Sequence, residues 1–256
     1  MKSLFTGLSD PGLVRTVNQD DYHLDDPEGR FFIVADGMGG HAGGQEASRI
    51  ATQEIQSYLN SNWQSSESSE TLLENAFLKA NQAIVQDQAN HPERADMGTT
   101  AVVVMLREGQ PFCAHVGDSR LYRLRGAKLS QITEDHTWVA RAMKLGDINS
   151  DQARVHPWRH VLSKCLGRED LRQIEVQPFD LQPSDRLLLC SDGLTEELPD
   201  HLIASHLKTI RAGDRAATAL VDAAKDNGGR DNITVVIVAF EDESDEILGK
   251  TSKTAG

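Results

Sequence analysis

The sequence contains little cysteine. Only Cys113, Cys165 and Cys190 are present, an odd number with no C-x-x-C spacing. A disulfide framework and a structural zinc site both need more thiols at shorter spacings, so the sequence disfavours them. We expect buried free thiols in a protein of the reducing cytosol.

Long apolar runs and clusters of basic residues are missing as well. No stretch approaches the roughly 20 apolar residues that a membrane-spanning helix needs, and the N-terminal MKSLFTGLSDPG is too polar for a signal peptide. The net charge is −13, without the Lys/Arg clusters of a nucleic-acid-binding protein. We therefore expect a cytoplasmic protein, a monomer, that binds neither membrane nor nucleic acid.

Periodicity in the 256 residues predicts a mixture of strands and helices. Strands and helices do not alternate regularly, which favours the α+β class over a doubly wound sheet. From residue 241 the chain begins EDESDE, and we expect residues 241–256 to be a disordered acidic tail. The expected strands are FFIVA (31–35), TTAVVVML (from 99), PFCAHV, RLYRLR, RLLLCS (186–191) and ITVVIVAF (233–240), and the expected helices cover 45–59, about 72–84 with Ser69 or Thr71 as its cap, and 214–225.

Four aspartates adjoin apolar or β-rich runs: Asp36, Asp118, Asp192 and Asp231. Asp-Gly is also a common hairpin turn, so each dipeptide taken singly is equally consistent with turn chemistry. The sequences GMGGHAGG after Asp36 and GLTEELPD after Asp192 do not lead into a second strand, and Asp231 precedes its strand. This arrangement favours a carboxylate pocket at one edge of a sheet.

An all-oxygen set of this kind favours Mg²⁺ or Mn²⁺ over zinc. Two such ions can activate a water molecule and neutralise a phosphate, and Arg15 is a candidate phosphate ligand, although it could equally be a surface arginine. A rival interpretation is that GMGGHA (37–42) is a dinucleotide-binding loop. The region about 20 residues further on, YLNSNWQSSESSE, lacks the second strand with a terminal acid that this interpretation requires.

Seven motifs together resemble the protein phosphatase 2C (PPM) family of metal-dependent serine/threonine phosphatases, in its compact bacterial form. The resemblance implies a central β-sandwich of two antiparallel sheets flanked by α-helices, in a single catalytic domain over residues 1–240 with a flap at about 145–165. It is strongest to the cyanobacterial phosphatases that act on the signalling protein PII. The motifs, in order, are GLVRTVNQDD, FFIVADGMGGHAGG, DMGTTAVVV, CAHVGDSRLYRLR, ITEDHTWV, LLLCSDGLTEEL and GGRDNITVVIV.

The resemblance also implies a metal-ligand set. Asp36 matches the carboxylate that bridges two ions, and the carbonyl group of Gly37 matches a ligand of the second ion. Asp192 and Asp231 match ligands of the first ion. Asp118, with Asp192, matches a third-ion site of bacterial members.

Other positions match residues around the metals. Arg15 matches the phosphate-binding arginine, and Asp20 matches an acid that holds metal-bound water. Gln19 replaces a glutamate found in many relatives. His41 is either a general acid or a loop residue that shapes the pocket, and His160 of the flap either approaches substrate or has a structural role.

These matches imply a phosphatase that hydrolyses phosphoserine and phosphothreonine with a metal-activated water, with a PII-like protein as one expected substrate. The sequence contains no C-x₅-R loop, so thiol-phosphatase chemistry is not expected. The alternative from another class is a catalytically inactive module that binds a phosphoprotein. Such a protein would be expected to lack metal-binding aspartates, whereas this sequence retains them.

Overall fold

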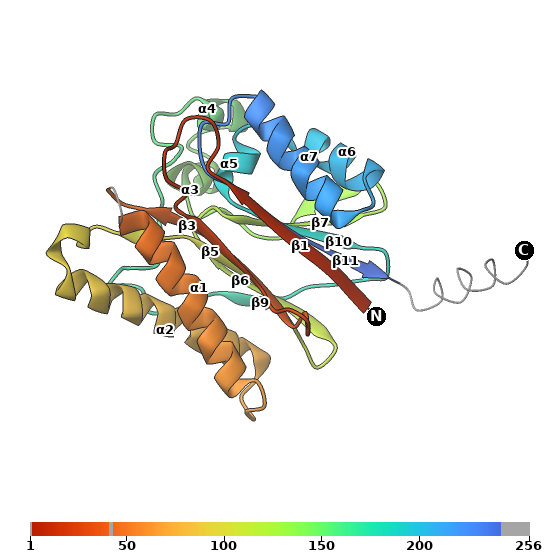
Figure 1. The fold of residues 1–256 in the computed structure, drawn as a ribbon. Helices are drawn as coiled ribbons and strands as arrows, with labels where there is room; N and C mark the ends of the chain where they lie inside the picture. The colour runs from red at the N-terminus through yellow and green to blue at the C-terminus, as the bar shows by residue number, and fades with distance from the viewer. Residues whose placement is uncertain (1, 41–42, 242–256) are drawn as a thin grey trace, which may run out of the picture.

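Two antiparallel β-sheets pack face to face in the computed structural model, which describes residues 2–40 and 43–241 (Figure 1). The first sheet has the order β1-β11-β10-β7-β8, and the second has the order β2-β3-β5-β6-β9, with β4 paired to β3. The predicted α+β sandwich is thereby confirmed. The first sheet is built from β1 (Lys2–Asp10), β7 (Arg120–Arg125), β8 (Lys128–Gln131), β10 (Arg186–Cys190) and β11 (Ile233–Glu241). The second is built from β2 (Asp20–Leu24), β3 (Phe31–Met38), β4 (Gly98–Thr99), β5 (Ala101–Arg107), β6 (Gln110–Val116) and β9 (Val176–Pro178).

Helices cover the outer face of each sheet (Figure 1). Helices α1 and α2 lie on the second sheet, and α6 and α7 lie on the first. The remaining helices lie near the sheet ends. The described helices are α1 (Gly43–Asn62), α2 (Ser69–Asn90), the 3₁₀ turn Pro92–Arg94, α3 (Trp138–Leu145), α4 (Ser150–Arg154), α5 (Asp192–Thr195), α6 (Asp200–Thr209) and α7 (Gly213–Asp226). None of them is long and apolar enough to cross a membrane.

Strand β3 shows why several strands read as unbroken apolar runs. Phe31, Ile33 and Ala35 pack against the helices outside the sheet. Phe32 and Val34 point the other way, into the layer between the two sheets. Successive side chains of a strand alternate between its faces, so a strand buried on both faces has no polar positions.

The cap of α2 differs from the prediction. Ser68 is the N-cap, and its side chain accepts a hydrogen bond from the Thr71 amide. The expected caps, Ser69 and Thr71, instead lie in the first turn of the helix. The polar segment 60–70 contains several serine and asparagine residues whose side chains could cap a helix, so the local sequence did not distinguish Ser68 from its neighbours.

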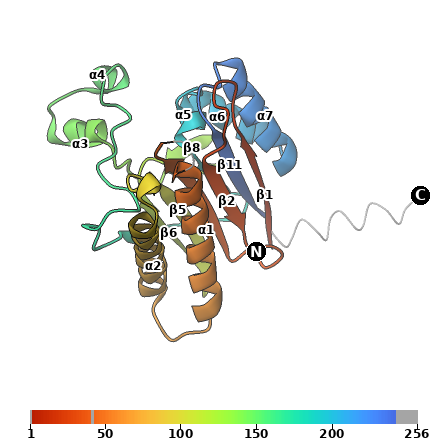
Figure 2. The same ribbon diagram turned by 60° about the vertical axis from the view of Figure 1, so that its left-hand side comes forward.

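The flap projects from the body of the molecule as α3, α4 and the loops around them (Figure 2). A bridge between Thr137 and Leu162 closes its base. Trp138 stacks on His156 at a centroid distance of 4.6 Å and meets Trp158 edge-on at 5.0 Å. The flap therefore has a small aromatic cluster of its own, and its first helix begins at Trp138, ahead of the predicted boundary at 145.

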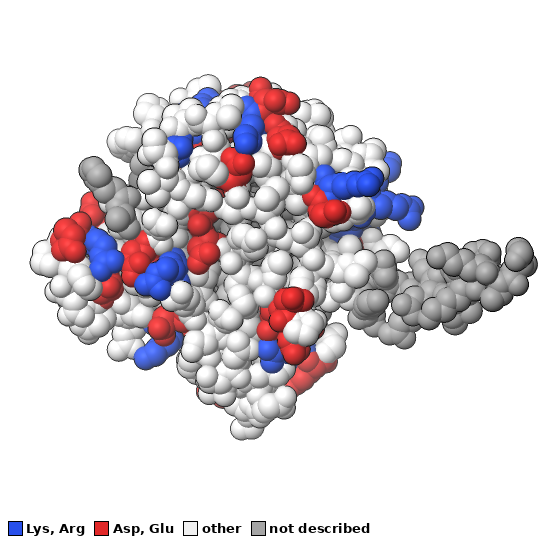
Figure 3. Space-filling model, viewed as in Figure 1, with Lys and Arg blue, Asp and Glu red and all other residues white. Residues whose placement is uncertain are grey.

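The surface seen in Figure 3 carries interspersed acidic and basic side chains. The three cysteines are free, with Cys113 and Cys190 buried and Cys165 partly exposed. Burial raises the pKa of both buried thiols to about 12, so neither is a nucleophile.

Candidate active site

Asp20 and Asp36 are direct neighbours on adjacent strands. The antiparallel register of β2 and β3 pairs them, although the sequence predicted that the strand ends before Asp36. Strand β3 continues to Met38 because Gly37 pairs with Thr99 of β4. Two carboxylates are therefore fixed on a rigid sheet, where repulsion between them needs a compensating charge.

The two carboxylate oxygens of Asp20 differ in their hydrogen bonding. Ser191 donates a hydrogen bond from its Oγ to Asp20 Oδ2 at 2.7 Å, and the same Oγ accepts from the Thr234 amide at 2.9 Å. Asp20 Oδ1 is buried without a hydrogen-bond partner among the described residues. Burial, with repulsion from Asp192 and Asp231, raises the pKa of Asp20 to about 7.

The backbone around Asp36 is fixed by β4. The Asp36 amide donates to Thr100 Oγ1 at 3.0 Å, and its carbonyl group accepts from Thr99 Oγ1 at 2.8 Å. Burial, followed by repulsion from Asp20, Asp192, Asp118 and Asp231, raises the pKa of the Asp36 carboxyl well above its usual range. All the predicted aspartates therefore act on one group, which means that the fold gathers them into one cluster.

Gly37 allows α1 to start directly against the site. A Cβ atom at Gly37 would lie 2.0 Å from the carbonyl oxygen of Gly44 and 2.6 Å from that of Gln19. The Gly37 amide donates to the Gln19 carbonyl oxygen at 3.1 Å. A side chain cannot fit here, so the sequence DG at this position reflects close backbone packing within a strand and not a hairpin turn.

Asp192 and Asp231 come from the adjoining ends of β10 and β11. These strands pair antiparallel, so the residue after β10 lies beside the residues that precede β11. Gly193 packs against this segment, since a Cβ there would lie 2.0 Å from the Asn232 carbonyl oxygen. Asp192 Oδ1 is buried without a hydrogen-bond partner among the described residues, and burial raises the Asp192 pKa to about 6.

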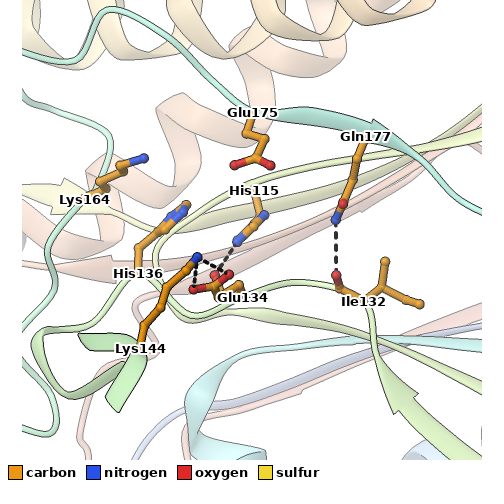
Figure 4. Close-up of a pocket in the computed structure, with 8 residues that line it drawn as sticks. All are labelled: His115, Ile132, Glu134, His136, Lys144, Lys164, Glu175 and Gln177. Atoms are coloured by element: carbon orange, nitrogen blue, oxygen red, sulfur yellow. Dashed lines mark hydrogen bonds and ion pairs between the residues drawn. The ribbon is translucent and has the colours of Figure 1, made fainter. Parts of the chain in front are cut away.

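Asp118 lies in the loop between β6 and β7, and the adjacent Gly117 is held by His136. The Gly117 amide donates to His136 Nδ1 at 3.2 Å, and the His136 amide donates to the Gly117 carbonyl oxygen at 2.9 Å. The His136 ring stacks on His115 at 4.5 Å, beside the pocket in Figure 4. Burial and the neighbouring His115 lower the His136 pKa to about 4, so Nδ1 remains an acceptor at neutral pH.

Arg15 lies at the mouth of the cluster. Its Nη2 donates to Asp231 Oδ2 at 2.7 Å, and its side chain is 52% exposed. Asn232 fixes the loop that carries Arg15, since its side-chain amide donates to the carbonyl oxygens of Pro11 and Val17. A guanidinium at the rim can reach an incoming anion without being buried itself.

His160 brings the flap to the cluster. Its Nδ1 lies 2.6 Å from Glu196 Oε1, and ligand atoms of His160, Glu196 and Asp192 lie within 4.8 Å of one another. The predicted His41 lies outside the described residues. Gln19 links several segments: its amide donates to Asn232 Oδ1 at 2.8 Å, its carbonyl oxygen accepts from Ser48 Oγ, and its side-chain Nε2 donates to the Gly39 carbonyl oxygen at 3.4 Å.

Several supporting residues were not predicted. Ser191 and Asn232 adjoin predicted aspartates in the motifs CSDG and RDN, and Thr99 and Thr100 lie within DMGTT. Their hydroxyl and amide groups are the signal that could have identified them. Glu196 offered no such signal, because its contact with His160 depends on how the flap folds back.

The donor set fits divalent cations. The oxygens belong to carboxylates, and two of them, Asp20 Oδ1 and Asp192 Oδ1, are buried without hydrogen-bond partners in the described part of the chain. Buried carboxylates with raised pKa values are expected where a cation is the missing partner. Hard ions such as Mg²⁺ or Mn²⁺ suit an all-oxygen site.

Comparisons with known proteins agree with this geometry. The protein phosphatase 2C family profile matches residues 14–223. The serine/threonine phosphatase stp of Listeria monocytogenes is 35% identical over 238 residues, which covers 90% of this chain and 93% of that protein.

Solved structures show the same fold. The Mycobacterium tuberculosis serine/threonine phosphatase PstP/Ppp superimposes with a TM-score of 0.85 at 32% identity, covering 94% of this chain and 99% of that one. A PstP catalytic domain in complex with two manganese ions gives a TM-score of 0.84 at 31% identity, covering the same 94% and 99%. The chain therefore belongs to the protein phosphatase 2C family and is a serine/threonine phosphatase.

Proposed function

We propose that this chain dephosphorylates phosphoserine and phosphothreonine in proteins with two divalent cations, Mg²⁺ or Mn²⁺. Asp36, the Gly37 carbonyl group, Asp192 and Asp231 would hold them. The observation that carries the proposal is the convergence of carboxylates in which Asp20 Oδ1 and Asp192 Oδ1 are buried without a hydrogen-bond partner within residues 2–40 and 43–241. When bound, the cations supply the positive charge that polarises the phosphoryl group and acidifies a water molecule.

Arg15 is proposed to bind the phosphoryl oxygens. Its planar guanidinium presents paired N–H groups that match two oxygens of a phosphate. Its contact with Asp231 at 2.7 Å keeps it at the cluster before substrate arrives. An arginine so positioned contributes to substrate binding and to neutralising charge that develops in the transition state.

Asp20 is proposed to orient the attacking water. Its Oδ2 accepts a hydrogen bond from Ser191, whereas Oδ1 has no partner among the described residues and is available to accept a hydrogen bond from water. Ser191 would fix the direction in which Oδ1 points.

His160 is proposed to approach the leaving-group side of the substrate. Glu196 accepts from its ring nitrogen Nδ1 and so orients it toward Asp192. The proposed roles of Asp118, as a ligand with Asp192 of a third ion, and of His41, as a general acid, rest on the resemblance of their motifs to those of bacterial members.

Two further proposals have the same basis. Residues 1–240 would form one catalytic domain, and a PII-like signalling protein would be one substrate. The motifs occur along the chain in the order of the family, which supports the first. The second is supported by the resemblance to the cyanobacterial phosphatases and is tested by hydrolysis of phosphorylated PII.

The defining experiment is hydrolysis of p-nitrophenyl phosphate and of a phosphothreonine peptide. Both reactions should proceed with Mn²⁺, stop with EDTA and resume when excess Mn²⁺ is added. Activity that persists in the chelator would contradict the metal-dependent reaction. Binding of the phosphopeptide without turnover, with Mn²⁺ present, would favour a binding module instead.

A further inference from the structure

The flap and the segment after it carry a charge opposite to that of the rest of the chain. Residues 137–172 contain seven basic and four acidic residues, whereas the remainder contains 19 basic and 35 acidic residues. The flap region is therefore net +3 in a chain of −13. A local positive region in an acidic protein attracts anions that the remaining surface repels.

The basic residues at the end of the flap surround a pocket of about 410 Å³. Lys164, Arg168 and Arg172 line it, and all three are exposed. Asp170 is the only acid in the lining, and it lies 3.7 Å from Arg168. Lys164 and Arg172 form no hydrogen bond or ion pair with any residue that the structure describes, and Lys164 also borders the pocket in Figure 4.

This segment is held firmly in place. Asn81 of α2 accepts hydrogen bonds from the amides of Gly167 and Arg168 and donates one to the Arg168 carbonyl oxygen. Gln88 donates to the Gly167 carbonyl oxygen at 3.0 Å. The basic side chains therefore project from a fixed backbone, which reduces the entropy lost when a ligand binds.

The same backbone is hydrogen-bonded to the catalytic strands. Leu166 and Thr99 exchange hydrogen bonds of 2.8 and 3.2 Å, and Thr99 pairs with Gly37. Leu166 thus lies two strand spacings, about 10 Å, from the Gly37 backbone. An extended peptide covers roughly 3.3–3.6 Å per residue, so about three to five residues span the distance from Gly37 to Leu166 and beyond it to the neighbouring residues Cys165 and Arg168, which line the pocket.

We propose that the pocket lined by Lys164, Arg168 and Arg172 binds anionic side chains that flank the phosphoserine or phosphothreonine of a substrate protein. It would thereby select phosphoproteins with acidic flanking sequences. The inference rests on the phosphatase activity proposed above. The anion is a carboxylate or a second phosphate, since both bind guanidinium and ammonium groups in the same way.

Four phosphothreonine peptides test the proposal. Three of them carry alanine, aspartate or lysine at the positions three to five residues from the phosphothreonine on each side. The fourth carries one additional phosphoserine in the same region. With wild-type protein and Mn²⁺, kcat/KM should be about three- to tenfold higher for the aspartate peptide than for the alanine peptide, and lowest for the lysine peptide. The differences should shrink in 0.5 M NaCl. A gain confined to the doubly phosphorylated peptide would identify a second phosphate as the anion.

The double variant Arg168→Glu/Arg172→Glu should reverse the order, so that the lysine peptide becomes the better substrate. A folding defect would lower all rates together and could not produce this reversal. The matched control Arg211→Glu/Arg215→Glu makes the same change of charge at exposed residues around the start of α7, and it should keep the wild-type order.

Equal kcat/KM for all four peptides in the wild type, or an unchanged order in the double variant, would overturn the inference. Either result would leave the phosphatase activity intact. Failure of the wild type to hydrolyse any peptide or p-nitrophenyl phosphate would instead contradict the proposed function.

Discussion

Arg15 donates a hydrogen bond to Asp231 at 2.7 Å, so the proposed phosphate ligand and a proposed metal ligand contact each other directly. Asn232 ties the Arg15 loop to the start of β11. The pairing places a cation beside a carboxylate cluster at the point where a phosphate would enter.

Arg15→Ala should raise KM for a phosphopeptide by about 10- to 100-fold, because a charge-assisted hydrogen bond to the phosphate is lost. The KM of Arg15→Lys should lie between those of the wild type and Arg15→Ala, since lysine keeps the positive charge but lacks the paired donors of the guanidinium. Steady-state kinetics with saturating Mn²⁺ measure this. An unchanged KM in Arg15→Ala would show that the guanidinium does not contact substrate.

Asp192→Asn should reduce kcat by more than about 100-fold, because it removes a negatively charged metal ligand while keeping the shape of the side chain. The fold should survive, as judged by circular dichroism. Asp222→Asn, on an exposed turn of α7, changes the charge equally and should retain full activity. Near-normal turnover by Asp192→Asn would remove this residue from the metal site.

The same variant should be more stable than the wild type in EDTA, and increasingly so as the pH rises. The folded-state pKa of Asp192 is raised to about 6 from an ordinary 3.8, so its contribution to stability is present below about pH 4 and is lost as the pH rises toward 6. The difference in free energy of unfolding between variant and wild type should therefore grow across this window, to about 1–3 kcal/mol. Chemical denaturation at pH 4.5, 5.5 and 6.5 measures this difference. A difference that does not change with pH would argue against a raised pKa of Asp192 in the folded protein.

Ser191→Ala should lower the free energy of unfolding by about 1–3 kcal/mol, because the buried Thr234 amide loses its acceptor and Asp20 loses its donor. Urea denaturation with Mn²⁺ present provides the value. Ser205→Ala, at an exposed position of α6, serves as the control with an expected change below about 0.5 kcal/mol. A loss of stability as small as that of Ser205→Ala would mean that Ser191 is not needed to hold Asp20 of β2 beside Thr234 of β11.

Gly37→Ala should prevent normal folding or displace α1, since the added Cβ would lie 2.0 Å from the Gly44 carbonyl oxygen. Gly40→Ala is the matched control, because its Cβ would meet nothing within 4 Å. Thermal denaturation should therefore show a much lower melting temperature for Gly37→Ala and little change for Gly40→Ala. Similar melting temperatures would indicate that β3 and α1 are not in close contact at Gly37.

The β-rich and helical segments that form the core could be predicted because their side chains are buried on one or both faces. Strands β1 and β2 were missed, since KSLFTGLSD and DDYHL are short on apolar residues and depend on neighbouring strands for their pairing. The end of β3 was misplaced because Asp36-Gly37 looks locally like a turn, and only the pairing of Gly37 with Thr99 extends the strand.

The aspartates of the candidate site could be predicted as a set, but their partners could not. The register that joins Asp20 to Asp36, and the contact between His160 and Glu196, both depend on long-range packing. Ser191 and Asn232 were visible in the motifs, yet nothing in the local sequence indicates which carboxylate or loop they hold.

Isothermal titration of the chelator-treated protein with Mn²⁺ measures directly whether these aspartates form a metal site. We expect at least two ions per chain in the wild type, with one or both lost in Asp192→Asn. Wild-type protein that binds no Mn²⁺, or a variant that binds as many ions with unchanged affinity, would contradict a metal site built from these aspartates.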